Sequence, residues 1–565
     1  MELKRLGDLL WKQFPNLYFL SIVLSVVTGL CYALLVPFVM YSIGTNVEEE
    51  VAQADRIFSY FDSPTASLAG LFLASCLFIL VMKSISTTLS MYVTNRAAVD
   101  HRLWLYRRIQ NTRLADLEKI GQARLVNVLN IDIPRVTDAA TSLPQMWISI
   151  VTVVGVLGYL THLNARVFGF VIASLVLAVI SYQLPLLFAS KFFRQSRDSY
   201  DRVQQGVSGL IYGTKELKLN RKKAEAYYKY DLLEPEARSL TDNLKGNSVI
   251  IFTETYGGIL SFLIIGIVVY HYRYVFALTP SELLGLSMAL LYLAGPLSLI
   301  MIVAGNLRHG QVSLRKLQSF YAELGEEVVA ESAPVPAGWH EISVHGLDYH
   351  YGGEAGGFAV RDVNLQFARG EISFIIGGNG SGKSTLGKCL SFHYLPVAGH
   401  IQLGDTAIDD GNIESARQFV SAIFPDYYLF KKLYTECDDA TREAVGGYLK
   451  YLELDHKVSV IGDEFSTTDL SEGQRKRLAL VAMLMEDRPV CIFDEWAADQ
   501  DPAFKEVFYS VILQDLKARN KVVIVISHDD RYFDYADQII TMESGRVVNA
   551  VRNTHVPAQR LVAMS

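Results

Sequence analysis

Long apolar runs separated by polar segments dominate the first half of the chain. Six of these runs approach or exceed the length that a bilayer-crossing helix needs, about 20 residues. One such run alone often forms a buried core helix, but six in succession predict a membrane domain. We place the spans at residues 17–41, 67–93, 143–160, 167–189, 248–270 and 283–304.

The second half follows a different pattern, in which short apolar runs alternate with helical and turn-rich segments. Runs at residues 372–376, 490–494 and 522–526 have the length of buried strands. Proline and glycine mark a boundary before them, within residues 326–338. We therefore predict an all-α six-helix transmembrane domain over residues 1–325, a linker over 326–338 and an α/β domain over 339–565.

Basic residues set the expected orientation, because cytoplasmic loops carry an excess of Lys and Arg. Eight fall in residues 94–142 and twelve in residues 190–247, whereas residues 42–66 hold only Arg56 among five acidic residues. Both termini and the α/β domain are then expected in the cytoplasm. The net charge of −7 gives no clear message about partners, and no nucleic-acid partner is expected.

A glycine-rich loop follows the first predicted strand and precedes a predicted helix. It fits the phosphate-binding pattern G-x-x-x-x-G-K-[ST], whose backbone N–H groups surround nucleotide phosphates. Lys383 would reach the β- and γ-phosphates of ATP, and the Ser384 hydroxyl would ligate Mg²⁺. The candidate ATP-binding residues of this loop are Gly377, Asn379, Gly380, Ser381, Gly382, Lys383, Ser384 and Thr385.

Two later strands end in residues that suit phosphate hydrolysis. The strand at 490–494 ends in Asp494 and is followed by Glu495. Asp494 would hold Mg²⁺, and Glu495 would act as general base on the attacking water. The strand at 522–526 leads to His528, which we interpret as a γ-phosphate contact that keeps the water and Glu495 in register.

With these motifs in order, residues 342–548 resemble the nucleotide-binding domain of an ABC transporter. Leu470-Ser471-Glu472-Gly473-Gln474 is similar to that family's LSGGQ signature, with Glu472 in place of a glycine. The resemblance implies that Ser471, Gly473 and Gln474 face the ATP held by the opposite subunit. It also implies that Tyr351 stacks on adenine and that Asp501 is the D-loop aspartate. A homodimer with two composite ATP sites follows.

One position departs from the family pattern. The loop that usually carries a glutamine near Mg²⁺ reads Ala422-Ile423-Phe424-Pro425-Asp426-Tyr427, and Pro425 has no side-chain donor or acceptor. Asp426 would serve as a Mg²⁺ contact, or it is simply a solvated loop residue.

The resemblance also assigns a role to the two long basic segments. Short coupling helices at residues 114–121 and 209–218 would press on the ATPase domain near Pro425 and Asp426. The alternative is charged helical surface with no coupling role.

The order of the domains resembles that of exporters. The segment Asp494–Pro502, DEWAADQDP, is similar to a bacterial subgroup that exports cyclic peptides, lipopeptides, siderophore precursors and microcin-type peptides. We expect a small peptide-like cargo moved across the bacterial inner membrane, with membrane lipids as the surroundings. A lipid flippase of the same mechanism and a nucleotide-gated protein that does not pump remain alternatives.

Ionisable residues inside a membrane span are candidates for cargo contact. Lys83 and Glu254 lie within the second and fifth predicted spans. They would pair with each other or with a charged cargo, or extend to the interface without a cargo role.

Overall fold

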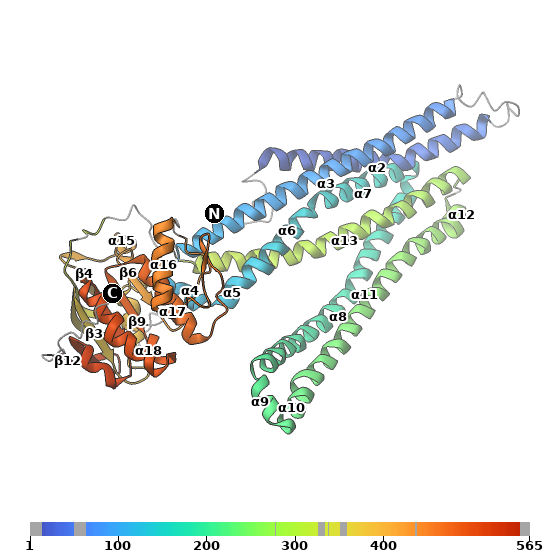
Figure 1. The fold of residues 1–565 in the computed structure, drawn as a ribbon. Helices are drawn as coiled ribbons and strands as arrows, with labels where there is room; N and C mark the ends of the chain where they lie inside the picture. The colour runs from blue at the N-terminus through green and yellow to red at the C-terminus, as the bar shows by residue number, and fades with distance from the viewer. Residues whose placement is uncertain are drawn as a thin grey trace. The chain divides into compact units, whose positions relative to one another are not determined.

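The computed structural model of the protein describes residues 14–49, 64–276, 278–325, 334–336, 338–350, 359–434 and 438–553. It divides into two compact units (Figure 1). Unit 1 comprises residues 1–102 and 127–319, and unit 2 comprises residues 103–126 and 320–565. The long helices α3 (Pro64–Gln110) and α13 (Pro280–Glu323) therefore contribute to both units.

Unit 1 is built from helices. In the described residues, six helical segments are long and apolar enough to cross a membrane, which agrees with the six predicted spans; they cover Pro15–Tyr41, Ala69–Gln110, Gln122–Leu163, Ala165–Tyr212, Arg221–Val275 and Pro280–Glu323. Besides α3 and α13, the helices are α2 (Pro15–Glu49), α6 (Ile133–Thr141), α7 (Leu143–Leu163), α8 (Ala165–Tyr212), α9 (Thr214–Leu219), α10 (Arg221–Tyr227), α11 (Glu234–Ile267) and α12 (Arg273–Val275), with π-helical turns η2 (Val128–Asp132), η3 (Tyr228–Leu233) and η4 (Val268–Tyr272) between them.

Small and hydroxyl residues let the helices of unit 1 approach closely. A Cβ atom at Gly155 of α7 would lie 2.4 Å from the Cβ of Ala33 on α2, so no larger residue fits there. The hydroxyls of Ser25 on α2 and Ser86 on α3 are 2.7 Å apart. Close approach and interhelical hydrogen bonds are what hold helices together in lipid, where burial of apolar side chains gives little driving force. Figure 1 also shows α8 and α11 running side by side.

The two ionisable residues of the predicted spans do not pair with each other. Lys83 is half-buried on α3, and its Nζ lies 5.5 Å from the centre of the Tyr32 ring. Glu254 is exposed on α11. Neither residue forms an ion pair with another described residue. The Lys83 ammonium instead lies over the aromatic ring of Tyr32.

Unit 2 contains a six-stranded sheet in the order β12-β11-β3-β10-β9-β6 and a four-stranded sheet in the order β2-β1-β4-β5. In the larger sheet only β12 is antiparallel to its neighbour. The strands are β1 (Glu341–His350), β2 (Ala359–Ala368), β3 (Glu371–Ile376), β4 (Ala398–Leu403), β5 (Thr406–Ala407), β6 (Val420–Ile423), β9 (Val490–Asp494), β10 (Val522–Ile526), β11 (Gln538–Glu543) and β12 (Arg546–Arg552), with a small hairpin β7 (Val460–Ile461) and β8 (Glu464–Phe465).

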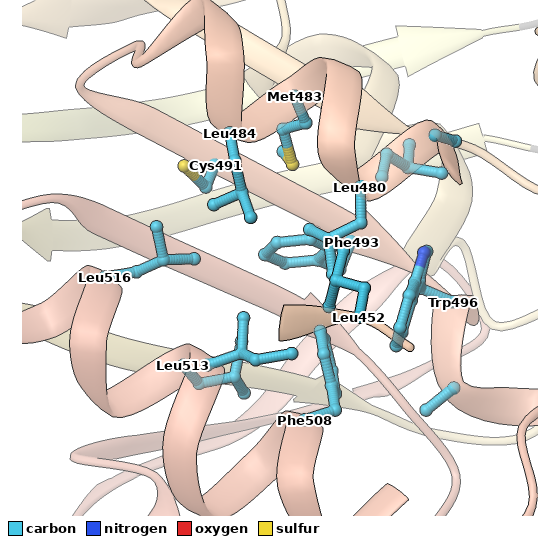
Figure 2. Close-up of a cluster of buried hydrophobic side chains, with 14 of the residues drawn as sticks. Leu452, Leu480, Met483, Leu484, Cys491, Phe493, Trp496, Phe508, Leu513 and Leu516 are labelled. Carbon is cyan, nitrogen blue, oxygen red and sulfur yellow. The ribbon is translucent and has the colours of Figure 1, made fainter. Parts of the chain in front are cut away.

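The larger sheet lies between two apolar cores because its central strands are buried on both faces. Successive residues of β9 alternate between them: Cys491 and Phe493 face one core, Val490 and Ile492 the other. Figure 2 shows the first core, where Phe493 and Trp496 meet Phe508 together with side chains of α17 and α19. Parallel strands covered on both sides read as continuous apolar runs, which is why the sequence located them.

The remaining elements of unit 2 are helices. They are α4 (Leu114–Ile120), α5 (Gln122–Asn127), α14 (Lys383–Leu390), α15 (Ile413–Arg417), α16 (Asp439–Tyr451), α17 (Glu472–Glu486), α18 (Pro502–Val507) and α19 (Leu513–Ala518), with short 3₁₀ segments η6 (Trp496–Asp499) and η8 (Asp530–Tyr535) and a π-helical turn η7 (Phe508–Ile512).

The first expected coupling helix, α4, makes its described polar contacts with residues at and just after the end of α14. Glu118 accepts hydrogen bonds from the Nζ of Lys388, 2.7 Å away, and from the hydroxyl of Tyr394. Arg113, just before α4, pairs with Asp410 at 2.7 Å. The acidic side chain of Glu118 thus meets a cation of α14, and the expected contact near Pro425 and Asp426 stays a prediction.

Candidate active site

Strand register brings three of the predicted motifs to one edge of the larger sheet. On β10, Ile526 pairs with Asp494 on one side and with Ile375 on the other. The carboxyl ends of β3, β9 and β10 are therefore level, which is the usual place for a ligand site in a parallel α/β sheet. The glycine-rich loop, Glu495 and His528 all follow directly from these strand ends.

The glycine-rich loop has the backbone that a phosphate-binding loop needs. Gly377, Gly380 and Gly382 have φ values of 147°, 77° and 104°, a region that other residues rarely adopt. A Cβ atom at Gly377 would lie 2.2 Å from the carbonyl oxygen of Met542, so the close approach also requires glycine. Asn379 and Gly380 are exposed at the tip of the loop, whereas Ser381 and Thr385 are buried beneath it.

Lys383 begins α14 and folds over the loop. Its Nζ donates to the carbonyl oxygens of Gly377 and Gly378, both 2.9 Å away. Burial lowers the pKa of this ammonium, and the nearby carboxylates of Glu495 and Asp494 oppose that change. The charge of Lys383 therefore lies among the acidic groups of the site, where it can neutralise phosphate oxygens.

Asp494 is a buried carboxylate at the end of β9. Neither of its oxygens has a hydrogen-bond partner of ordinary geometry in the described part of the chain. Burial raises its pKa and the charge of Glu495 adds to this, while the nearby Ser384 hydroxyl acts in the opposite direction. Unpaired oxygens beside a hydroxyl suit a hard divalent cation.

Mg²⁺ therefore fits the residues present, with Asp494 and Ser384 as the groups that would hold it. Asp426 is exposed, but its charge is close enough to raise the pKa of Asp494 slightly. Within the described residues, no group of three or more His, Cys, Asp and Glu side chains could hold a metal ion by itself. Mg²⁺ usually binds only one or two protein oxygens and completes its coordination shell with phosphate and water, so it does not require such a group.

Glu495 and His528 face each other across the end of the sheet. The Nε2 of His528 lies 3.0 Å from Oε1 of Glu495, and both side chains reach solvent. Glu495 has a left-handed backbone, φ 50° and ψ 29°, which is uncommon for a residue other than glycine and is often found at functional turns. The arrangement places a carboxylate that can accept a proton beside an imidazole that can orient it.

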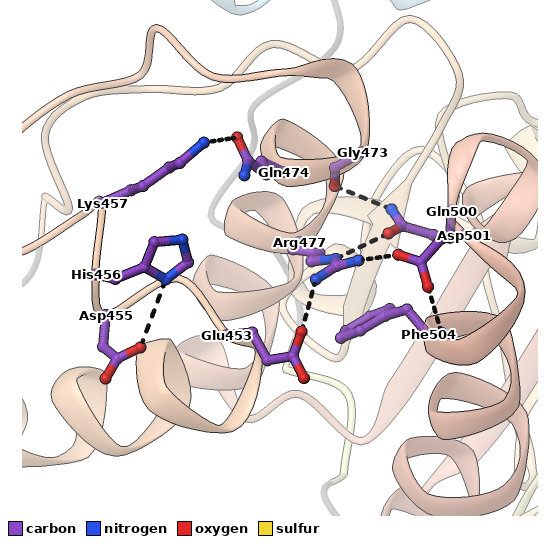
Figure 3. Close-up of polar contacts among 10 residues, drawn as sticks. All are labelled: Glu453, Asp455, His456, Lys457, Gly473, Gln474, Arg477, Gln500, Asp501 and Phe504. Carbon is purple, nitrogen blue, oxygen red and sulfur yellow. Dashed lines mark hydrogen bonds and ion pairs between the residues drawn. The ribbon is translucent and has the colours of Figure 1, made fainter.

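The signature segment begins α17 and lies against the D-loop, as Figure 3 shows. Ser471 is the N-cap, and its backbone N–H donates to Oε1 of Gln474 at 3.3 Å. The Nε2 of Gln500 donates to the carbonyl oxygen of Gly473 at 3.0 Å. Asp501 caps α18 and pairs with Arg477 at 2.6 Å; its pKa is lowered first by the backbone N–H of Phe504 and then by Arg477.

The loop after β6 reaches toward the signature segment. Pro425 and Asp426 are exposed, whereas Tyr427 is half-buried and packs against the core that contains α17. Burial and the charge of Glu472 raise the pKa of Tyr427. The aromatic residue after the missing glutamine thus lies beside the start of the signature helix, a contact that the sequence pattern did not indicate.

Three residues of this region were missed by the sequence reasoning. Trp496 and Lys476 are both buried, and both join α17 to the turn at Glu495. Arg477 binds Gln500 and Asp501. Lys476 stands between Arg475 and Arg477 in a basic run, so no local pattern marked it as buried. Tyr351, the expected adenine contact, lies outside the described residues.

A family model, curated relatives and a solved structure all resemble this chain. Residues 360–498 match the family model described as ABC transporter. The chain is 30% identical over 559 residues to the ATP-binding protein SyrD of Pseudomonas syringae pv. syringae, with 96% of each chain covered. It is 24% identical over 486 residues to an ATP-dependent lipid A-core flippase of Thiobacillus denitrificans, with 83% of each covered. A bacterial Atm1-family ABC exporter with ATP bound has the same fold, with a TM-score of 0.73, 16% identity and 95% of each chain covered.

Proposed function

The chain belongs to the ABC transporter family as an ATP-hydrolysing half-exporter with several membrane spans, and we propose that it exports a peptide-derived natural product across the bacterial inner membrane. The observation that carries the hydrolytic part is the contact between Glu495 and His528 beside the phosphate loop and Asp494. The full-length likeness to SyrD, at higher identity than the flippases, supports the exporter subgroup that the DEWAADQDP segment resembles.

The proposed hydrolysis gives each site residue one role. Glu495 takes a proton from the attacking water, and His528 holds the γ-phosphate and the glutamate in register. Lys383 neutralises charge on the β- and γ-phosphates, and the loop N–H groups bind their oxygens. Asp494 and Ser384 would hold Mg²⁺, which would offset phosphate charge.

A homodimer supplies the second half of each ATP site. In this arrangement Ser471, Gly473 and Gln474 contact the nucleotide that the other copy holds on its phosphate loop. ATP binding then brings the ATPase domains together and hydrolysis releases them. The basic segments 94–142 and 190–247 support a cytoplasmic location for both termini.

Within the spans, Lys83 is the residue best placed to meet an anionic or aromatic group of a cargo. Its ammonium contacts the ring of Tyr32, and among the described residues it has no carboxylate partner. An unpaired cation in a span is costly unless it serves a substrate pathway or reaches the interface. The secretion experiment below therefore also includes Lys83→Ala. Loss of secretion would indicate a role in cargo contact, and unchanged secretion would indicate that Lys83 only reaches the membrane interface.

The flippase relatives favour a second candidate, which moves a lipid-linked substrate by the same mechanism. The two functions make different predictions for purified protein. Peptide export predicts that the ATPase is stimulated by peptide-type metabolites, whereas a flippase predicts stimulation by lipid alone.

The test compares wild type with Glu495→Gln in purified form and in cells. We expect the ATPase rate to fall at least about 100-fold, because the general base is lost, while ATP binding persists. A deletion strain carrying Glu495→Gln should fail to secrete a peptide-type metabolite that wild type restores, as measured by mass spectrometry of the medium. An unchanged hydrolysis rate refutes the role of Glu495, and unchanged secreted peptides with altered outer-leaflet lipids favour the flippase.

A further inference from the structure

Lys476 is a buried cation on the signature helix α17. Its side chain is 5% exposed. Burying an ammonium is unfavourable unless it finds acceptors, and Lys476 finds two. Its Nζ donates to the carbonyl oxygen of Glu495 at 3.2 Å and pairs with Asp499 at 2.6 Å.

A second contact runs in the opposite direction between the same two segments. The indole Nε1 of Trp496 donates to the carbonyl oxygen of Lys476 at 2.9 Å. Trp496 is fully buried and stacks on Phe508, with ring centres 4.3 Å apart. The residue that follows Glu495 is thus fixed in the core, and α17 is joined to the turn at Glu495 by two hydrogen bonds of opposite direction.

The turn that these contacts hold is the one that aims the general base. Glu495 has a left-handed backbone, a conformation that persists only when its surroundings enforce it. Its backbone N–H donates to the carbonyl oxygen of Ile526 on β10 at 3.0 Å. Its own carbonyl oxygen accepts from the Nζ of Lys476 and from the N–H of Ala498. The backbone is fixed from both sides, while the carboxylate is left to meet His528.

We infer that Lys476 is a positioning residue, which holds the turn at Glu495 so that its carboxylate stays in line with the attacking water. The lysine does not touch the nucleotide in this arrangement. It acts through the carbonyl of Glu495. In the homodimer of the proposed function, α17 also meets the partner's ATP, so Lys476 would join the chemistry of one composite site to the nucleotide contact of the other.

The chain offers a matched control in Lys521. This lysine is also buried, with 7% of its side chain exposed, and pairs with the exposed Asp487 at 2.7 Å. Its Nζ donates to the carbonyl oxygen of Arg488 at 2.7 Å. The two lysines therefore have the same kinds of partner, but Lys521 lies at the start of β10, the opposite end of the strand from His528.

The experiment measures ATP hydrolysis by purified full-length wild type, Lys476→Met, Lys476→Arg and Lys521→Met. We expect Lys476→Met to lower kcat roughly 10- to 100-fold and to change KM for ATP by less than about threefold, because misplacing a base affects the transition state more than binding. Lys476→Arg, which keeps the charge and donors, should recover part of kcat. Lys521→Met should keep kcat within about twofold of wild type.

Folding is checked by binding of a fluorescent ATP analogue to each variant. The acid left behind in Lys476→Met, Asp499, is 51% exposed and can be solvated by water. Lys476→Met with a normal kcat, or Lys521→Met with the same loss as Lys476→Met, overturns the inference. This assay measures ATP hydrolysis and not export. Its result therefore stays valid even if the proposed cargo is wrong.

Discussion

At the scale of single residues, burial decides which groups of the ATPase unit are reactive. Asp494 is buried with unpaired oxygens, and burial raises its pKa. Glu495, the next residue, reaches solvent and His528. Two adjacent carboxylates thus have different surroundings, one suited to a cation and one to a water molecule. This division of roles is common where two acidic groups share a site.

Burial also protects two thiols of the same unit. It raises the pKa of Cys491 to about 12 and raises that of Cys389 as well. The thiolate is the reactive form, so little of it exists at pH 8. We expect both to resist alkylation by iodoacetamide in the native protein and to react fully in denaturant, as measured by mass spectrometry of tryptic peptides. Rapid native labelling of Cys491 at pH 8 would contradict the burial of β9.

The sequence located the strands and loops of the site because each rests on a local pattern. The predicted strand at 522–526 is β10, and the predicted strand at 490–494 is β9. The sequence did not indicate the contacts of Lys476 and Trp496, because these join residues about twenty positions apart whose meeting depends on how α17 packs against β6 and η6. The contacts of Glu118 on α4 with Lys388 and Tyr394 were likewise not indicated, because they join residues 270 or more positions apart in the chain.

At the scale of elements, α4 is held in place by tertiary contacts, among them those of the Glu118 carboxylate. The helix is only seven residues long and its N-cap, Arg113, makes no side-chain capping hydrogen bond. A helix this short is not stable by itself. Glu118 accepts from Lys388 and Tyr394, and Leu114 and Ala115 pack against the second core. Tertiary contacts therefore hold α4 on α14, the helix that carries Lys383.

Removing the carboxylate should loosen α4. We expect Glu118→Ala to speed amide hydrogen exchange in residues 114–120 by about tenfold, since a hydrogen bond to a charged group contributes about 1.5 kcal/mol. Glu323→Ala is the control, because Glu323 forms an ion pair with Arg124 at 2.6 Å on an exposed surface, where such pairs contribute little. Equal exchange in wild type and Glu118→Ala would mean that Leu114 and Ala115 suffice.

At the scale of the whole molecule, the phosphate loop and the signature segment of one chain are proposed to serve different ATP molecules. The signature residues Ser471 and Gly473 begin α17, and Gln500 of the D-loop binds the carbonyl oxygen of Gly473. These two segments are held together as one surface. A second copy related by twofold symmetry would present the same surface, as an isologous dimer requires.

Mixing two inactive chains tests this arrangement directly. Lys383→Ala removes the cation expected to contact the phosphates, and Gly473→Asp adds a side chain whose Cβ would lie only 3.0 Å from the carbonyl oxygen of Asp499. If sites are shared between copies, each homodimer has two damaged sites, whereas the mixed dimer has one intact site and one doubly damaged site. We expect mixed dimers, purified through two different tags, to hydrolyse ATP at up to about half the wild-type rate. If each chain instead completed its own site, both sites of the mixed dimer would be damaged, and its activity would stay at the level of the inactive homodimers.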